Sequence, residues 1–223
     1  MQKSEQRSSL TQSQEDYLKA LYQLRQDDRA VTTSEVAERL AVSAASATEM
    51  LGKLAALGLV DHDRYRGASL TPAGEAVALE MIRHHRLLEI FLTRALGYRW
   101  DEVHEEAERL EHHISERFEA RIFDSLGRPD VDPHGDPIPT LEGEMPSEQH
   151  RTLAECRQGE RLGVRRVSDR DPGKLRALEL LGFRLDEPVE VVKESLYEGP
   201  VVVKVGGRRR QVLLGLARAV YVA

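Results

Sequence analysis

The chain has 223 residues, of which 40% are hydrophobic and 5% aromatic, and no apolar run approaches the length that crosses a membrane. This composition excludes a membrane-spanning protein and suits a helix-rich soluble protein of one large domain or two to three small ones. The single cysteine, Cys156, excludes an internal disulfide framework. Together with an N-terminus that lacks a signal-peptide core, it leads us to expect a cytoplasmic protein.

The formal net charge is −6, which is the wrong sign for a protein that binds nucleic acid constitutively. The acidic excess is concentrated in residues 77–145, which hold 8 Lys+Arg and 16 Asp+Glu. An acidic centre is suited to a cation site, although a solvated helical segment can carry the same charge.

The N-terminal segment predicts three helices. Apolar residues at helical spacing indicate a first helix over residues 9–30. A short helix then begins at Thr33 or Ser34, and a break at Ala41 and Val42 separates it from a helix over residues 44–57 that Ser43 caps and Gly58 ends. A short helix, a tight turn and a second helix form a helix-turn-helix.

The next segment predicts a β-hairpin, because two short apolar pieces flank the charged, glycine-containing stretch around residues 61–67. A helix-turn-helix followed by a hairpin is a winged helix, which favours DNA binding over a small helical domain with a surface hairpin. Small and hydroxylic side chains at a helix start can approach a groove and bond phosphates. We expect DNA contacts from Thr33, Ser43, Ala45, Ser46, Thr48, Glu49, Lys53, Arg64 and Arg66.

A long helix is predicted from Pro72 to a stop at Gly97. Its broad apolar surface exceeds what one small domain needs, which favours pairing with a second copy of the chain. This surface is formed by Ile82, Leu87, Leu88, Phe91 and Leu92.

Residues 100–126 predict another helix, because apolar side chains recur at three- and four-residue steps and no Pro or Gly interrupts them. On such a helix four chelating side chains share one face: His104, Glu108, Glu111 and His112. Imidazole and carboxylate at this spacing form a ligand set for a divalent metal. The alternative is a charged outer face with surface histidines.

Residues 127–146 are rich in proline and cannot form a regular helix, so their composition predicts a linker. The remainder predicts strands over residues 160–167, 187–192, 201–205 and 219–222 and a short helix over 174–181. Short strands with one short helix indicate a small SH3-like β-barrel.

Five motifs together resemble the diphtheria-toxin-repressor and manganese-transport-regulator family of metal-dependent repressors. They are found in residues 15–22, 64–74, 85–89, 108–113 and 132–139, and the resemblance covers nearly the whole chain. It implies a mainly α protein with a small β part. Residues 1–75 would form a winged-helix DNA-binding domain, residues 76–146 a helical dimerisation and metal-binding domain with its linker, and residues 147–223 an SH3-like, FeoA-like domain.

The resemblance also implies metal ligands. A first site would consist of Asp16, His85, Glu108, Glu111 and His112, so that metal would connect the DNA-binding domain to the dimerisation helices. Asp16 and Glu108 are carboxylates where iron-type members carry Met and Cys, and hard oxygen favours Mn²⁺, with Fe²⁺ also possible. Lys19 stands where shorter manganese regulators carry a Glu ligand, which argues against their two-metal cluster.

A second site is implied at Glu89, Asp132 and His134, with Asp169 from the tail domain. Iron-type members instead use the position of His104 for their ancillary metal, and His104 could join Glu89 and His85. The choice between these two sets stays open.

The function implied is a homodimeric regulator that binds a double-stranded DNA operator when loaded with metal and represses metal-uptake genes. One alternative is an iron-responsive repressor of the same fold, and another is a winged-helix regulator with an organic effector. A di-iron oxidase is disfavoured, because no histidine between His84 and His113 has a Glu three residues before it. With no Ser/His/Asp order or P-loop, we expect no catalysis.

Overall fold

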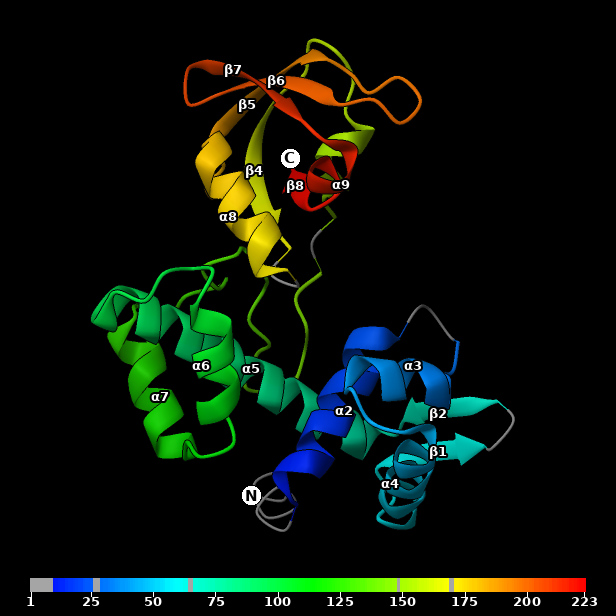
Figure 1. The fold of residues 1–223 in the computed structure, drawn as a ribbon. Coiled ribbons are helices and arrows are strands. Elements are labelled where there is room, and N and C mark those ends of the chain that lie inside the picture. Colours follow the sequence, from blue (N-terminus) through cyan, green and yellow to red (C-terminus); the bar gives the residue numbers. More distant parts are fainter. Residues whose placement is uncertain (1–9, 26–28, 64–65, 148, 169–170) are drawn as a thin grey trace. The chain divides into compact units, whose positions relative to one another are not determined.

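The computed structural model describes residues 10–25, 29–63, 66–147, 149–168 and 171–223. The chain forms two compact units, and the long helix α5, Pro72–Leu96, contributes to both (Figure 1). The first unit comprises the residues up to His85 together with Glu111–Ile114 and Pro139–Met145, and the second comprises the rest. None of the described helices combines the length and the apolar character needed to cross a membrane.

The first unit contains the predicted helix-turn-helix. Its helices are α2, Gln12–Leu24, α3, Thr33–Arg39, and α4, Ala44–Ala56. Thr11, Thr32 and Ser43 cap them, each through a side-chain oxygen that accepts a hydrogen bond from the backbone three residues on. The first helix is therefore shorter than predicted, and α3 begins one residue earlier because Thr32 is its cap. Apolar side chains from all three helices, among them Leu18, Val36 and Leu51, form one core.

The predicted wing is present as strands β1, Val60–Asp63, and β2, Gly67–Leu70, which pair antiparallel from Val60 opposite Leu70. Gly67 is required at the start of β2. Its φ is 102°, and a Cβ there would lie 2.3 Å from the carbonyl oxygen of Val31. The neighbouring Ala68 exchanges two backbone hydrogen bonds of 2.8 Å with Val31, which join the hairpin to the segment before α3.

The apolar surface of α5 does not remain open, so the argument that it predicts a dimer was wrong. Ile82, Leu87, Leu88 and Leu92 are all buried within the chain itself, and Phe91 is half-buried in an edge-to-face contact with Phe118. The chain covers most of this face with its own helices. Dimer formation therefore needs support from elsewhere.

The helix predicted over residues 100–126 is two helices, α6, Val103–Leu110, and α7, Glu116–Ser125. A turn separates them, and Ser115 caps α7 through its Oγ, which accepts from the backbone of Phe118. The prediction of one ligand face was accordingly wrong. His104 and Glu108 lie on α6, whereas Glu111 and His112 lie in the turn and belong to the other unit.

The tail of the chain belongs to the second unit and has an open sheet with helix α8, Pro172–Leu181, alongside it (Figure 1). The strand order is β3-β8-β4-β5-β6-β7, and among the described residues no pairing of β7 with β3 closes a barrel. The strands are β3, Arg151–Thr152, β4, Arg161–Val167, β5, Pro188–Lys193, β6, Val201–Val205, β7, Arg208–Val212, and β8, Val220–Val222. The short helices are η1, Leu153–Glu155, and α9, Leu214–Ala217.

The linker prediction was correct for backbone structure, since residues 127–147 contain no helix or strand beyond one isolated bridge between Val131 and Pro137. It was incomplete in that the middle of the linker is packed rather than exposed. Asp132, His134 and Ile138 are all buried. The segment thus has a definite place in the second unit.

Candidate metal centres and DNA-binding face

The turn after α6 places its side chains against α2 and the first half of α5. The backbone carbonyl of Glu111 lies 3.2 Å from Nδ1 of the fully buried His84. Glu111 itself is fully buried. These contacts explain why the turn belongs to the first unit, and why helical periodicity alone could not show where the helix ends.

His112 lies between two carboxylates of α2. Its Nδ1 is 2.6 Å from Oε2 of Glu15, and its Nε2 is 3.0 Å from Oδ1 of Asp16 and 3.8 Å from Oε1 of Glu111. Burial acts to lower the pKa of His112, but the hydrogen bonds to Asp16 and Glu15 outweigh it and raise the pKa to about 9. Sequence reasoning did not identify Glu15 as a partner of His112.

Lys19 is buried beside Glu111 and His85. Its Nζ donates to both carboxylate oxygens of Glu111 at 2.8 Å and lies 3.3 Å from Nδ1 of His85, which is itself 2.5 Å from Oε2 of Glu111. Burial acts to raise the pKa of Glu111, yet the hydrogen bond with His85 and the charge of Lys19 hold it below its usual value. Glu111 is therefore shared by two sets of partners, one on the Asp16 side and one on the Lys19 side.

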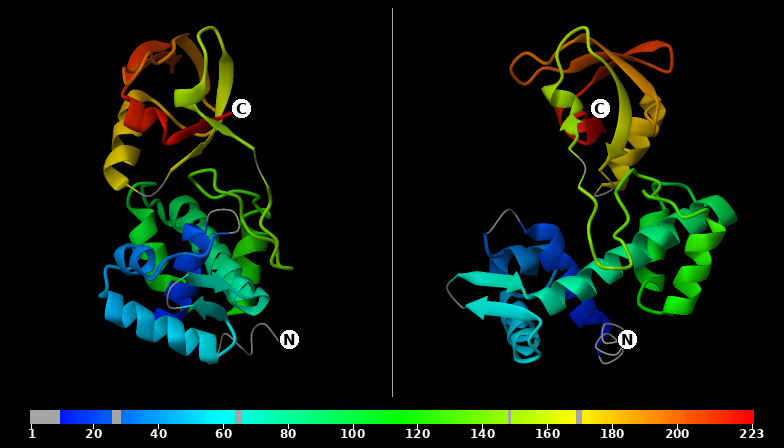
Figure 2. Two further views of the ribbon diagram at one scale, coloured as in Figure 1. Left: turned by 90° about the vertical axis from the view of Figure 1, so that its right-hand side faces the viewer. Right: turned by 180° about the vertical axis from the view of Figure 1, so that it is seen from behind.

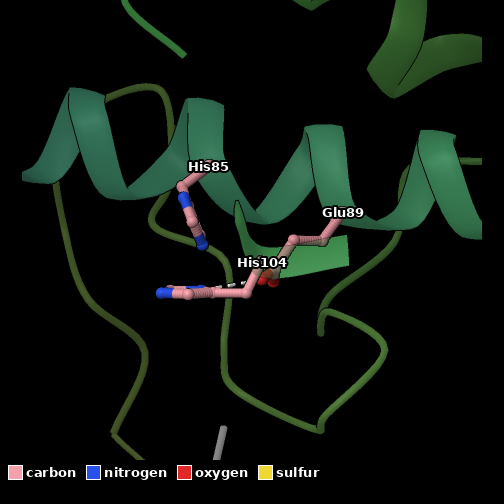
Figure 3. Close-up of side chains that lie close together, drawn as sticks. All are labelled: His85, Glu89 and His104. Atoms are coloured by element: carbon pink, nitrogen blue, oxygen red, sulfur yellow. Dashed lines mark hydrogen bonds and ion pairs between the residues drawn. The ribbon is translucent and has the colours of Figure 1, made fainter. Parts of the chain in front are cut away.

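The remaining predicted ligands of the helical segment are on α5 and α6. His85 and Glu89 project from α5 one turn apart, and His104 approaches Glu89, with 3.3 Å between its Nδ1 and Oε1 of Glu89 (Figure 3). Nε2 of His104 is 4.0 Å from Oε1 of Glu108, which is largely exposed. Within the second unit, His104 is thus connected to Glu89.

A second cluster joins α5 to the linker, where Glu89, Asp132 and His134 each offer a donor atom within 4.8 Å of the others. Nδ1 of His134 is 3.6 Å from Oε2 of Glu89 and 3.9 Å from Oδ2 of Asp132, and all three side chains are buried. Burial acts to lower the pKa of His134, but the two carboxylates raise it to about 12. The pKa of Asp132 is raised to about 6, chiefly by burial.

Packing around this cluster fixes its shape. Nε2 of His134 is 2.8 Å from the carbonyl oxygen of Trp100, and its own carbonyl accepts from the backbone of Val167 at 2.8 Å. Gly135 has a φ of 90°, and a Cβ there would lie 2.1 Å from the carbonyl oxygen of Arg165. The linker is therefore held against β4. Asp169 lies outside the described residues.

Both clusters suit a divalent cation by the chemistry of their donors. Each combines carboxylate oxygens with an imidazole nitrogen, a set that suits Mn²⁺ and Fe²⁺. In the second cluster, Nδ1 of His134 and Oδ2 of Asp132 make no hydrogen bond within the described part of the chain, although both are buried. A bond from the other ring nitrogen to a carbonyl is the usual support of a metal-binding histidine.

The predicted DNA contacts gather at the start of α4 and at the wing. Ser43, Ala45, Ser46, Thr48, Glu49 and Lys53 are all exposed, and Thr33 is half-buried at the start of α3. The hairpin contacts α4 through β1 and lies beside it (Figure 2). Arg66 is exposed, whereas Arg64 lies outside the described residues.

Three family models match the chain. Residues 9–68 match the N-terminal DNA-binding domain of iron-dependent repressors, residues 71–140 their metal-binding and dimerisation domain, and residues 151–223 the FeoA domain. The diphtheria toxin repressor of Corynebacterium efficiens is 30% identical, with 96% of each chain covered. The chain belongs to the diphtheria-toxin-repressor family. Its members are transcriptional repressors, and this chain is a metal-responsive, DNA-binding regulator of metal homeostasis.

Relatives of both metal types are similar to this family member. The iron-dependent repressor IdeR of Mycobacterium leprae is 35% identical over 60% of this chain and 58% of its own. A solved manganese-dependent transcriptional repressor in complex with manganese is 44% identical, with a TM-score of 0.86 and coverage of 94% of this chain and 99% of that one. The predicted family and the three-part architecture are thereby confirmed.

Proposed function

We propose that this regulator is activated by Mn²⁺ and, as a cytoplasmic homodimer, represses genes for metal uptake. The observation that carries the proposal is the cluster of Asp16, Glu111 and His112, whose donor atoms all lie within 4.8 Å of one another. Asp16 stands on the first helix of the DNA-binding unit. Metal held there bears directly on the segment that precedes the helix-turn-helix.

The first site would be held by Asp16, Glu111 and His112, with Glu108 and His85 as its further members. Asp16 and Glu108 supply hard oxygen atoms, and hard donors favour Mn²⁺ over metals that prefer sulfur. When bound, the ion supplies positive charge that draws carboxylates and imidazole together. Fe²⁺ is the second candidate, supported by the match of residues 71–140 to iron-dependent repressors.

The second site would be held by Glu89, Asp132 and His134, with Asp169 completing it from the tail domain. In sequence Asp169 follows Val167, whose backbone is bonded to His134. His104 is the alternative partner of Glu89, because their side chains are 3.3 Å apart. Either set would connect the linker or α6 to α5 and stabilise the second unit.

The DNA-binding role of the exposed residues on α4 is a proposal that rests on their position. Ser43, Ser46 and Thr48 would bond phosphates or base edges from the helix start, while Lys53, Arg64 and Arg66 would contact phosphates. Thr33, Ala45 and Glu49 would lie at the same face. Replacing Arg64 and Arg66 by Ala should lower the affinity for all duplexes and reduce the salt dependence of binding.

Metal preference tests the proposal. We expect Mn²⁺ to activate DNA binding at a lower free concentration than Fe²⁺ in anaerobic, metal-buffered titrations. The double variant Asp16→Met, Glu108→Cys should shift the response toward softer metals. A wild-type protein that responds to less Fe²⁺ than Mn²⁺, or a double variant that keeps the wild-type order, contradicts the assignment to manganese.

A further inference from the structure

Lys19 is an unusual residue to find beside a cation site. Its side chain is 5% exposed, and its ammonium group bonds both oxygens of Glu111, whose side chain is 1% exposed. The same Nζ lies 3.3 Å from Nδ1 of His85. A positive charge inside a group of proposed metal ligands should repel a metal ion, unless it replaces one.

The contacts divide this cluster into two halves that share Glu111. On one side, Nε2 of His112 is 3.0 Å from Asp16 and 3.8 Å from Glu111. On the other side, Glu111 and His85 converge on Nζ of Lys19. The first half offers an imidazole and two carboxylates to a cation, while the second half already contains one.

We propose that the ammonium group of Lys19 acts as a built-in second cation, so that the first site binds a single divalent ion on the Asp16–His112 side. The inference rests on the proposed function, because it concerns the metal that the site would hold. Lys19 is thus a positioning residue that sets the number of ions. It keeps Glu111 oriented by its second pair of contacts.

The charges agree with this assignment. Glu15, Asp16 and Glu111 supply three carboxylates in this unit, and Glu108 is proposed as a fourth. Lys19 and one divalent ion bring three positive charges, which leaves the site close to neutral. Two divalent ions together with Lys19 would bring five, and a buried excess of charge is costly.

The first test counts ions. Equilibrium dialysis against Mn²⁺ with metal analysis should give one ion fewer per chain for His112→Ala than for the wild type. Lys19→Glu, which replaces the ammonium by a carboxylate, should bind one ion more. Lys204→Glu makes the same charge change on the exposed surface of the tail and should keep the wild-type count.

The outcomes separate the inference from the proposed function. If His112→Ala loses one ion but Lys19→Glu gains none, the role of Lys19 is refuted and the site remains. If His112→Ala binds as many ions as the wild type, the first site is wrong, and the inference falls with it.

A second variant covers the case in which Lys19→Glu does not fold. Lys19→Met removes the charge and keeps the length of the side chain, so it should melt at a lower temperature than the wild type in chelator. Mn²⁺ should then raise its Tm by more than that of the wild type, because an ion can take the place of the ammonium. An equal Tm increase in both proteins would mean that Lys19 is merely structural, and would overturn the inference.

Discussion

At the scale of single residues, His112 makes metal binding depend on pH. Its pKa of about 9 means that the imidazole is protonated at neutral pH, whereas a metal ion needs it neutral. Binding at pH 7 must therefore release a proton. We predict that Mn²⁺ affinity rises about tenfold per pH unit between pH 6.5 and 8.5 and levels off near pH 9. Calorimetry in buffers of different ionisation enthalpy measures both quantities, and an affinity that does not change with pH would contradict this role.

Cys156 illustrates a residue whose chemistry is suppressed by its surroundings. The side chain is buried in the core of the tail domain, and burial raises the pKa of its thiol to about 11. Since the thiolate is the reactive form, we predict that a thiol reagent at pH 8 labels the folded protein far more slowly than the urea-unfolded chain. Equal labelling rates would show that the tail core opens readily.

At the scale of elements, the turn between α6 and α7 shows what sequence reasoning could not see. Apolar periodicity runs through residues 100–126, so it predicted one helix and placed Glu111 on the face of His104. The break depends on long-range contacts of Glu111 and His112 with α2 and α5, which periodicity does not record. The local signal that was available is Ser115, followed by Glu116, at the start of α7.

The cap of α7 should contribute measurable stability. Ser115→Ala removes the Oγ that accepts from the backbone of Phe118, and such a loss costs about 1 kcal/mol. We predict a decrease of that size in the free energy of unfolding, measured by urea denaturation in chelator. Ser115→Asp, which restores an acceptor, is the matched control and should remain close to the wild type.

The linker tests whether packing fixes the second site. Gly135 and Gly127 both have positive φ, but only at Gly135 would a Cβ clash with the backbone, while at Gly127 it would meet open space. Gly127→Ala should cost about 1–2 kcal/mol through its backbone conformation alone. Gly135→Ala should cost more and also lose one bound Mn²⁺, counted by metal analysis. Retention of every ion in Gly135→Ala would separate this loop from metal binding.

At the scale of the whole molecule, the order of the three parts could be predicted from sequence, because caps, hairpin signals and strand patterns are local. The edge strand β7 was missed because Arg208, Arg209 and Arg210 give it no apolar pattern, although the preceding Gly206 and Gly207 are a hairpin signal. The closed barrel and the open apolar face of α5 were wrong for the same reason. Both depend on how distant segments pack.

Dimer formation is supported by the matched dimerisation domain rather than by α5. Leu96, Tyr98 and Phe118 are exposed apolar side chains of this region, and we propose that they contribute to the dimer face. Phe118→Glu should shift the protein toward monomers in sedimentation equilibrium. Leu180→Glu, at an exposed position of α8, should not. A wild-type protein that stays monomeric at micromolar concentration with Mn²⁺ would refute the dimer.

Metal-dependent DNA binding is the property that joins the helix-turn-helix to the carboxylate–imidazole cluster. Its most direct measurement is a fluorescence anisotropy titration of a duplex that the full-length protein has selected from random sequences in Mn²⁺. We predict tight binding with Mn²⁺, loss of at least about a hundredfold in affinity with chelator, and the same loss in His112→Ala with Mn²⁺ present. Equal affinity with Mn²⁺ and with chelator would contradict the account.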